Sequence, residues 1–261
     1  VRPILPPISK TIAKQVLPGE RLELELDKEN WDGELAQSVL NVSAAPTAGV
    51  KDALNWLNSY PYGCLEQNCA TAFPFLGLEN LQKAKLLDSA VSASSLRKVE
   101  RMMLKVISMM HSDGSFSIWP GSETTSVSTS IFAAHFLIGA ERNLALNLDT
   151  EVKKVLIKSL ENNLSPQNTS RWQKAYSCYV LSLTKRGSFV TTARDILNTK
   201  TDDFAAFMAA AALMQGSFAA EANEYFPALM QQEVWLSSEG IANEYIANSV
   251  CRKGVALSIL M

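Results

Sequence analysis

The sequence predicts a mainly α-helical fold of stacked helix hairpins, preceded by a short β segment. From Gly49 onward, apolar residues recur every three or four positions in segments separated by short polar stretches. Before Gly49 the clearest pattern alternates every second residue, as in a half-exposed strand. We expect the β segment to span residues 1–45 and the helical domain to span residues 46–261.

The β segment begins with a proline-rich stretch that excludes a helix. Residues 17–21, Leu-Pro-Gly-Glu-Arg, have the composition of a turn. The strict alternation over residues 22–27, Leu-Glu-Leu-Glu-Leu-Asp, then predicts a strand with one solvent-facing side. Residues 40–43 form a second, weaker candidate. Two strands are too few for a β domain of their own.

About ten helices are expected in residues 46–261, joined by short loops. One helix face is formed by Leu96, Val99, Met103, Val106 and Met110. Residues 202–215 begin with two aspartates, which suit a helix N-terminus, and continue with alanines that permit close packing and burial all round. Residues 130–138, 174–181 and 204–211 share small and aromatic residues, which indicates a weak repeat of hairpins. Periodicity alone does not decide between an open solenoid and a closed ring.

Composition excludes several classes of function. The 24 basic and 26 acidic residues give a net charge of −2, which disfavours nucleic-acid binding. No apolar run is long enough to cross a membrane, so no membrane contact is expected from this piece. The chain begins with Val1 and ends in the middle of an apolar helical pattern, which indicates a piece of a longer protein.

Four cysteines and two histidines are too few, and wrongly spaced, for a disulfide scaffold or an ordinary zinc site. We therefore expect no metal and no cofactor. Cys69, Cys178 and Cys251 are interpreted as packed thiols, because free cysteine behaves as a small apolar residue.

The remaining cysteine lies in a distinctive segment, residues 60–69, Tyr-Pro-Tyr-Gly-Cys-Leu-Glu-Gln-Asn-Cys. Pro61 restricts the backbone, and Gly63 permits a positive φ just before Cys64. Cys64 is thereby placed at a tight turn at a helix N-terminus, where the helix dipole favours a thiolate.

The spacing Cys64-X-X-Gln67 has a chemical meaning of its own. A turn brings residues three apart together, so the thiolate can reach the Gln67 carboxamide carbon. Attack with loss of ammonia closes a thiolactone ring of about 15 atoms, an activated acyl group. Amines or hydroxyls would attack the glutamyl carbonyl and become covalently attached, whereas water would destroy the group unless it is kept dry.

Residues 61–67, Pro-Tyr-Gly-Cys-Leu-Glu-Gln, resemble the thioester motif of the α2-macroglobulin and complement family in its bacterial form. Two later stretches, residues 113–121 and 128–137, resemble the segment that follows the thioester helices in this family. The resemblance covers residues 46–261 and implies the family's thioester domain, an α/α toroid like that of terpenoid cyclases. Residues 1–45 resemble strands of the neighbouring CUB-like β-sandwich.

The resemblance also implies roles for individual residues. Cys64 and Gln67 are the cross-linked pair, and Gly63, Leu65 and Glu66 complete the motif. Glu66 is outside the ring and is expected only to cap or orient the turn. The aromatic residues Tyr60, Tyr62 and Trp119 are candidates for shielding the thioester, with ordinary packing as the alternative.

A histidine in some complement members takes the acyl group first and directs it to hydroxyls. The corresponding stretch here, residues 164–173, contains no histidine. His135 lies in the earlier helix and is expected to be a packed core residue. His111 is interpreted as a helix-end residue.

The function implied is that of a bacterial α2-macroglobulin-like endopeptidase inhibitor, not an enzyme, which traps proteases covalently through the thioester. Its partners would be target endopeptidases and the other macroglobulin domains of the full chain. The family resemblance places it outside the cytoplasm, in the periplasm or secreted.

Two other functions stay open at this stage. Cys64 is also compatible with the nucleophile of a hydrolase or acyltransferase that uses His111 or His135 as base. The toroid fold is shared with terpenoid-processing enzymes, but their acidic Asp-x-Asp-Asp pattern is absent, and Asp202-Asp203 alone is better explained as a helix start.

Overall fold

The computed structural model describes residues 12, 14–23, 38, 40, 63–77, 89–165, 169–199 and 204–231. The chain divides into two compact units, residues 1–42 and 43–261. Each unit is described separately.

The first unit contains the predicted turn. The Glu20 N–H donates to the Leu17 carbonyl at 3.0 Å, and Gly19 between them has a φ of +88°. A proline followed by a glycine with positive φ is typical of a type II turn. Leu22 and Glu23 are described as loop, and the rest of the two predicted strands lies almost wholly outside the described residues, so the β segment stays a prediction.

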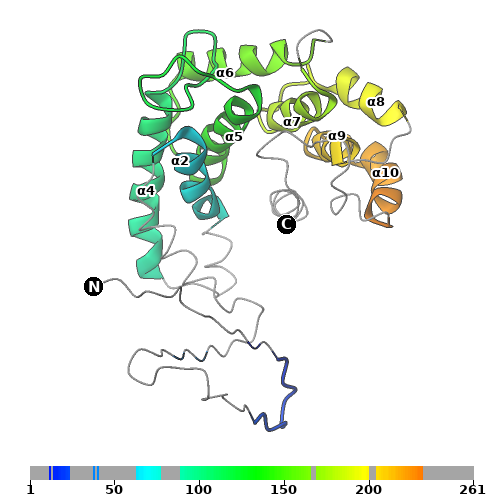
Figure 1. Cartoon of the computed structure of the whole chain (residues 1–261). Helices are drawn as coiled ribbons and strands as arrows, with labels where there is room; N and C mark the ends of the chain where they lie inside the picture. Colours follow the sequence, from blue (N-terminus) through cyan, green and yellow to red (C-terminus); the bar gives the residue numbers. More distant parts are fainter. Residues whose placement is uncertain are drawn as a thin grey trace, which may run out of the picture. The chain divides into compact units, whose positions relative to one another are not determined.

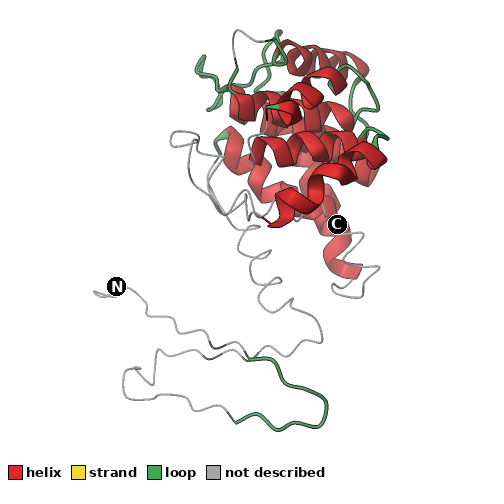
Figure 2. Cartoon of the chain, turned by 90° about the vertical axis from the view of Figure 1, so that its right-hand side faces the viewer, coloured by secondary structure: helices red, strands yellow, loops and turns green. Residues whose placement is uncertain are grey.

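The described part of the second unit is helical (Figures 1 and 2). Its elements are α2 (Leu65–Ala72), the 3-10 helix η1 (Phe73–Gly77), α4 (Ser89–Ile107), α5 (Val127–Leu144), α6 (Thr150–Asn162), α7 (Arg171–Ser182), α8 (Val190–Asn198), α9 (Phe204–Gln215) and α10 (Ala219–Gln231). The predicted aspartates at the start of α9 lie outside the described residues.

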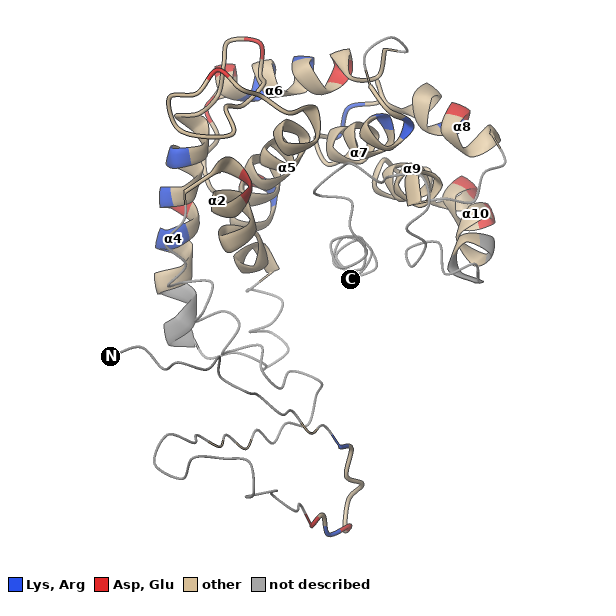
Figure 3. Cartoon of the chain, viewed as in Figure 1, with Lys and Arg blue, Asp and Glu red and all other residues tan. Residues whose placement is uncertain are grey.

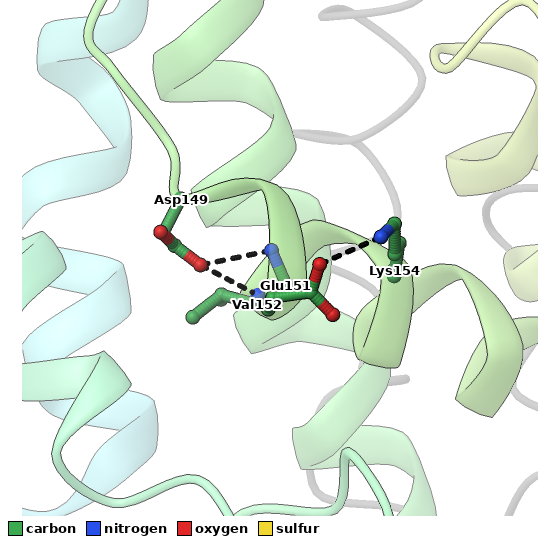
Figure 4. A network of polar contacts seen from close by, with 4 residues as sticks. All are labelled: Asp149, Glu151, Val152 and Lys154. Carbon is green, nitrogen blue, oxygen red and sulfur yellow. Dashed lines mark hydrogen bonds and ion pairs between the residues drawn. The ribbon is translucent and has the colours of Figure 1, made fainter.

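Side-chain caps fix where several of these helices begin. Asp149 accepts hydrogen bonds from the backbone N–H groups of Glu151 and Val152 at the start of α6 (Figure 4). Lys154 pairs with Glu151 one turn along the same helix. Ser170 forms a reciprocal capping box with Gln173 at the start of α7. Such caps satisfy N–H groups that the helix itself leaves unpaired.

The helices alternate between two layers, as expected for the α/α toroid (Figure 1). The inner layer contains α2, α5, α7 and α9, and each packs against the next. The outer layer contains α4, α6, α8 and α10. The first three lie against the inner helices that precede and follow them, and α10 lies against α9. Charged side chains are concentrated on outer helices such as α4 and α6 (Figure 3).

The inner layer is held together by small and aromatic side chains. Every residue of α9 from Phe204 to Leu213 is buried, which confirms the predicted burial all round. The alanines of α9 bring α7 close, and the rings of Trp172 and Phe204 stack at 5.0 Å between the two helices. Within the described residues, no helix combines the length and apolarity needed to cross a membrane.

Candidate functional site

Cys64 and Gln67 occupy the first turn of α2. Cys64 is the N-cap residue, with extended backbone angles, and its side chain is buried. Its carbonyl accepts the N–H of Asn68 at 2.9 Å, the first hydrogen bond of the helix. Gln67 follows within the same turn, so the backbone places the two residues three positions apart at a helix start, as the motif predicts.

The Gln67 carboxamide is unusual for a buried polar group. Its oxygen Oε1 is inaccessible to solvent and has no hydrogen-bond partner in the part of the chain that the structure describes. An unpaired buried carbonyl costs roughly 1–3 kcal/mol, and most such atoms are therefore paired in folded proteins. A glutamine retained only for structure would be expected to use this acceptor.

The neighbours of Cys64 within the motif differ in their roles. Leu65 is fully buried and belongs to the hydrophobic core. Glu66 is half-buried, and burial raises the pKa of its carboxyl. Its position in the first turn suits the positive end of the helix dipole.

Gly63 lies directly before the N-cap residue Cys64. Its φ is not in the positive region, so the left-handed conformation that a glycine permits before Cys64 is not used. The glycine instead accommodates α4, because a Cβ at this position would lie 3.1 Å from the Lys105 Nζ. Close approach of a neighbouring side chain is the second common reason for a glycine.

Asn68 is a site residue that sequence reasoning missed. Its side chain is buried, and its Nδ2 donates to the Gly63 carbonyl at 2.9 Å and to the Met109 sulfur at 4.0 Å. It therefore links the residue before Cys64 to α2 and to the connection that follows α4. The signal in the sequence is a polar residue beside Cys69 in a helix with a mostly apolar buried face.

The connection between α4 and α5 contacts the start of α2. The Leu65 N–H donates to the Ile118 carbonyl at 2.9 Å, and the Ile118 N–H donates to Thr124 at 2.8 Å. Antiparallel bridges join Met110 to Phe116 and Ser117 to Thr125 within this connection. Residues 108–126 thus satisfy a backbone N–H that α2 leaves unpaired.

The predicted shielding residues remain candidates. Tyr60 and Tyr62 lie outside the described residues. Trp119 directly follows Ile118, and its residue is 53% exposed. Its contribution to shielding stays a prediction.

His135 has the packed environment that was expected. Its Nδ1 lies 3.0 Å from the Tyr176 hydroxyl, and its ring meets Phe73 and Tyr179 edge-on. Burial lowers its pKa to about 3, so the ring is neutral near neutral pH. The described contacts of His135 are with aromatic residues and do not include Cys64 or Gln67.

His111 is also engaged away from Cys64. Its Nε2 lies 2.8 Å from the Ser117 hydroxyl in the connection that precedes α5. Neither histidine has a described contact with the Cys64 thiol. The geometry gives no support to a hydrolase in which one of them is the base.

The other described cysteines are buried thiols, as predicted. Cys69 and Cys178 are free of disulfides, and Cys251 lies outside the described residues. Burial raises the pKa of the Cys69 thiol, and nearby Cys64 and Glu66 raise it further. Burial raises the pKa of Cys178 to about 12. Groups of three or more potential metal ligands are absent from the described residues.

Comparison with known proteins shows what the segment that carries this site is similar to. Residues 34–157 match the family model of the A-macroglobulin TED domain. This stretch is therefore similar to a TED domain of the A-macroglobulin family. The α2-macroglobulin of Rickettsia conorii is 25% identical over 195 residues, which cover 74% of this chain and 10% of the relative.

Solved structures share the fold of this chain. The α2-macroglobulin of Salmonella, crystallised after reaction with methylamine, matches 81% of this chain and 15% of its own, with a TM-score of 0.63 and 19% identity. The native α2-macroglobulin of Escherichia coli, from domain MG7 to the C-terminus, matches 81% of this chain and 35% of its own, with a TM-score of 0.61 and 20% identity. The chain therefore spans a small part of these proteins.

Proposed function

We propose that Cys64 and Gln67 form an internal thioester and that the full-length protein uses it to trap proteases covalently. In the forming step, the Cys64 thiolate attacks the Gln67 Cδ, the C–N bond breaks, and the amide nitrogen leaves as ammonia with the proton it needs. In the trapping step, an amine attacks the same carbon, the C–S bond breaks, and the Cys64 thiolate leaves and takes up a proton.

The observation that carries this proposal is the buried Gln67 Oε1 without a hydrogen-bond partner among the described residues, in the same helical turn as Cys64. An acyl carbon in such surroundings is kept from water, which an activated ester requires. The Salmonella α2-macroglobulin reacted with methylamine, a small amine of the class that would attack such a carbon, and this supports the same chemistry here.

The nucleophile is expected to be an amine. The described part of residues 164–173 offers no imidazole, and Arg171 there donates to the Ile196 carbonyl and the Thr199 hydroxyl. His135 is buried among aromatic rings. A thioester that is attacked directly prefers amines, because hydroxyls need a general base or a more reactive acyl intermediate.

This proposal makes the chain a stoichiometric trap rather than an enzyme. Its partners are target endopeptidases and the other macroglobulin domains of the complete protein, and its location is outside the cytoplasm. These statements rest on the similarity to bacterial α2-macroglobulins and on the proposed chemistry of Cys64.

The test uses full-length protein mixed with a serine endopeptidase. We expect a covalent complex, resistant to denaturant and reducing agent, that is lost in Cys64→Ala and kept in Cys69→Ala. The second variant is a matched control, because Cys69 is a buried thiol on the same helix. Equal complex formation by wild type and Cys64→Ala would rule out this function.

A further inference from the structure

The Ile118 carbonyl is the contact by which the connection between α4 and α5 holds the start of α2. It accepts the Leu65 N–H at 2.9 Å, directly after Cys64. The first N–H groups of a helix have no partner inside the helix, so the position of this carbonyl constrains where the helix begins. Whatever fixes Ile118 therefore also fixes the backbone of Cys64.

Ile118 is preceded by a buried serine with two hydrogen-bond partners. The Ser117 hydroxyl donates to the Ser122 carbonyl at 2.5 Å and lies 2.8 Å from the His111 Nε2. A serine hydroxyl has one hydrogen, which is used toward Ser122. The His111 Nε2 must therefore carry a hydrogen and donate it to Ser117.

The two hydrogen bonds of Ser117 run across the connection between α4 and α5. His111 lies at the end that follows α4, and Ser122 lies at the end that approaches α5. The two hydrogen bonds from His111 to Ser117 and from Ser117 to Ser122 thus join both ends of this connection next to Ile118. Backbone bonds from Ser117 to Met109 and from Ile118 to Thr124 run in the same region.

We propose that His111 is a positioning residue for Cys64, which acts by donating from Nε2 to Ser117 and so holding the Ile118 carbonyl against the Leu65 N–H. The role concerns backbone placement, and His111 takes no part in the chemistry. Its effect on thioester lifetime rests on the proposed function, whereas its effect on the Leu65 N–H does not.

The test is amide hydrogen exchange at Leu65 in full-length protein. We expect His111→Ala to speed this exchange about fivefold or more, since one hydrogen bond that holds the carbonyl is lost. His111→Gln retains an N–H donor and is expected to restore the wild-type rate. Ser122→Ala is the matched control, because it removes a hydroxyl that accepts from Thr124 but leaves the Ser122 carbonyl in place.

Two outcomes would overturn the proposal: unchanged Leu65 exchange in His111→Ala, or exchange in His111→Gln as fast as in His111→Ala. If His111→Ala does not fold, Ser117→Ala is measured instead, because it removes the hydroxyl that links His111 to Ser122. Thioester lifetime is followed in the same samples by mass. A wild type with no thioester would contradict the proposed function while leaving the Leu65 result to decide the role of His111.

Discussion

The Asn68 side chain donates a hydrogen bond to the Gly63 carbonyl at 2.9 Å, and this bond spans the residue on which the proposed chemistry depends. Asn68 lies inside α2, whereas Gly63 lies before the helix begins. Cys64 is thus enclosed between two bonded residues, and its backbone is fixed from both sides.

Replacing Asn68 with leucine should therefore destabilise the domain and disturb the turn. The variant leaves the Gly63 carbonyl without this donor, which costs roughly 1–3 kcal/mol of unfolding free energy. Urea denaturation measures the loss. Thr71→Val is the control, because it removes only a bond to the Asn68 carbonyl within the helix. A loss no greater than that of the control would show that Asn68 does not hold the turn.

Two glycines should respond differently to alanine. At Gly63, among the described residues, the new Cβ meets only the end of the Lys105 side chain, so Gly63→Ala should cost less than about 1 kcal/mol. Gly114 has a φ of +83°, and a Cβ there would lie 2.7 Å from the Ser159 Cβ. Gly114→Ala should cost roughly 2 kcal/mol or more. Thermal denaturation of both variants checks this, and the reverse order would contradict the backbone conformation at Gly63.

His135 should make stability depend on pH in the acidic range. Burial lowers its folded pKa from 6.5 to about 3, so between these values the unfolded chain binds a proton that the folded chain does not. The stabilisation from the neutral, buried His135 is fully present above pH 6.5. As the pH falls from 6.5 toward 3, the free energy of unfolding decreases by up to about 1.4 kcal/mol per pH unit.

The comparison that isolates this effect is His135→Gln, which keeps a polar partner for the Tyr176 hydroxyl but does not titrate. Its unfolding free energy should fall less steeply with acid than that of the wild type. Identical slopes for the two proteins between pH 6.5 and 4 would show that His135 is accessible to protons in the folded state.

Nucleophile choice is the fourth expectation. After activation by a protease, full-length protein should couple to methylamine and lysine amines, and only poorly to glycerol. Because an amine attacks in its neutral form, coupling should increase as the pH rises toward the lysine pKa of about 10.4. Competition between labelled methylamine and glycerol measures the preference. Preferential glycerol uptake that disappears in His135→Ala would make His135 a catalyst.

The sequence predicted the layers of the fold better than the details of the site. Val99, Met103 and Val106 are buried on one face of α4, as their spacing indicates, because burial of apolar side chains depends mainly on periodicity. Leu96 is the first residue of the same pattern and is 38% exposed. Spacing alone does not show which positions of an apolar helix face are covered by a neighbour.

The site contains features that no local pattern specifies. Gly63 lies close to Lys105 from another helix, and the residue type alone permits a positive φ that the turn does not use. The Leu65 bond to Ile118 joins backbone atoms of distant segments, which side-chain identity does not encode. The polar side chain of Asn68 beside Cys69 does not by itself indicate that its Nδ2 donates to the Gly63 carbonyl.

The most direct test of the central claim is peptide mapping of native full-length protein by mass spectrometry. The account predicts one cross-linked species in which Cys64 and Gln67 are joined and one ammonia is missing. Methylamine should convert it to a free Cys64 thiol and a methylamide at Gln67. Freshly prepared full-length protein with a free Cys64, an unmodified Gln67 and no mass change with methylamine would contradict the account.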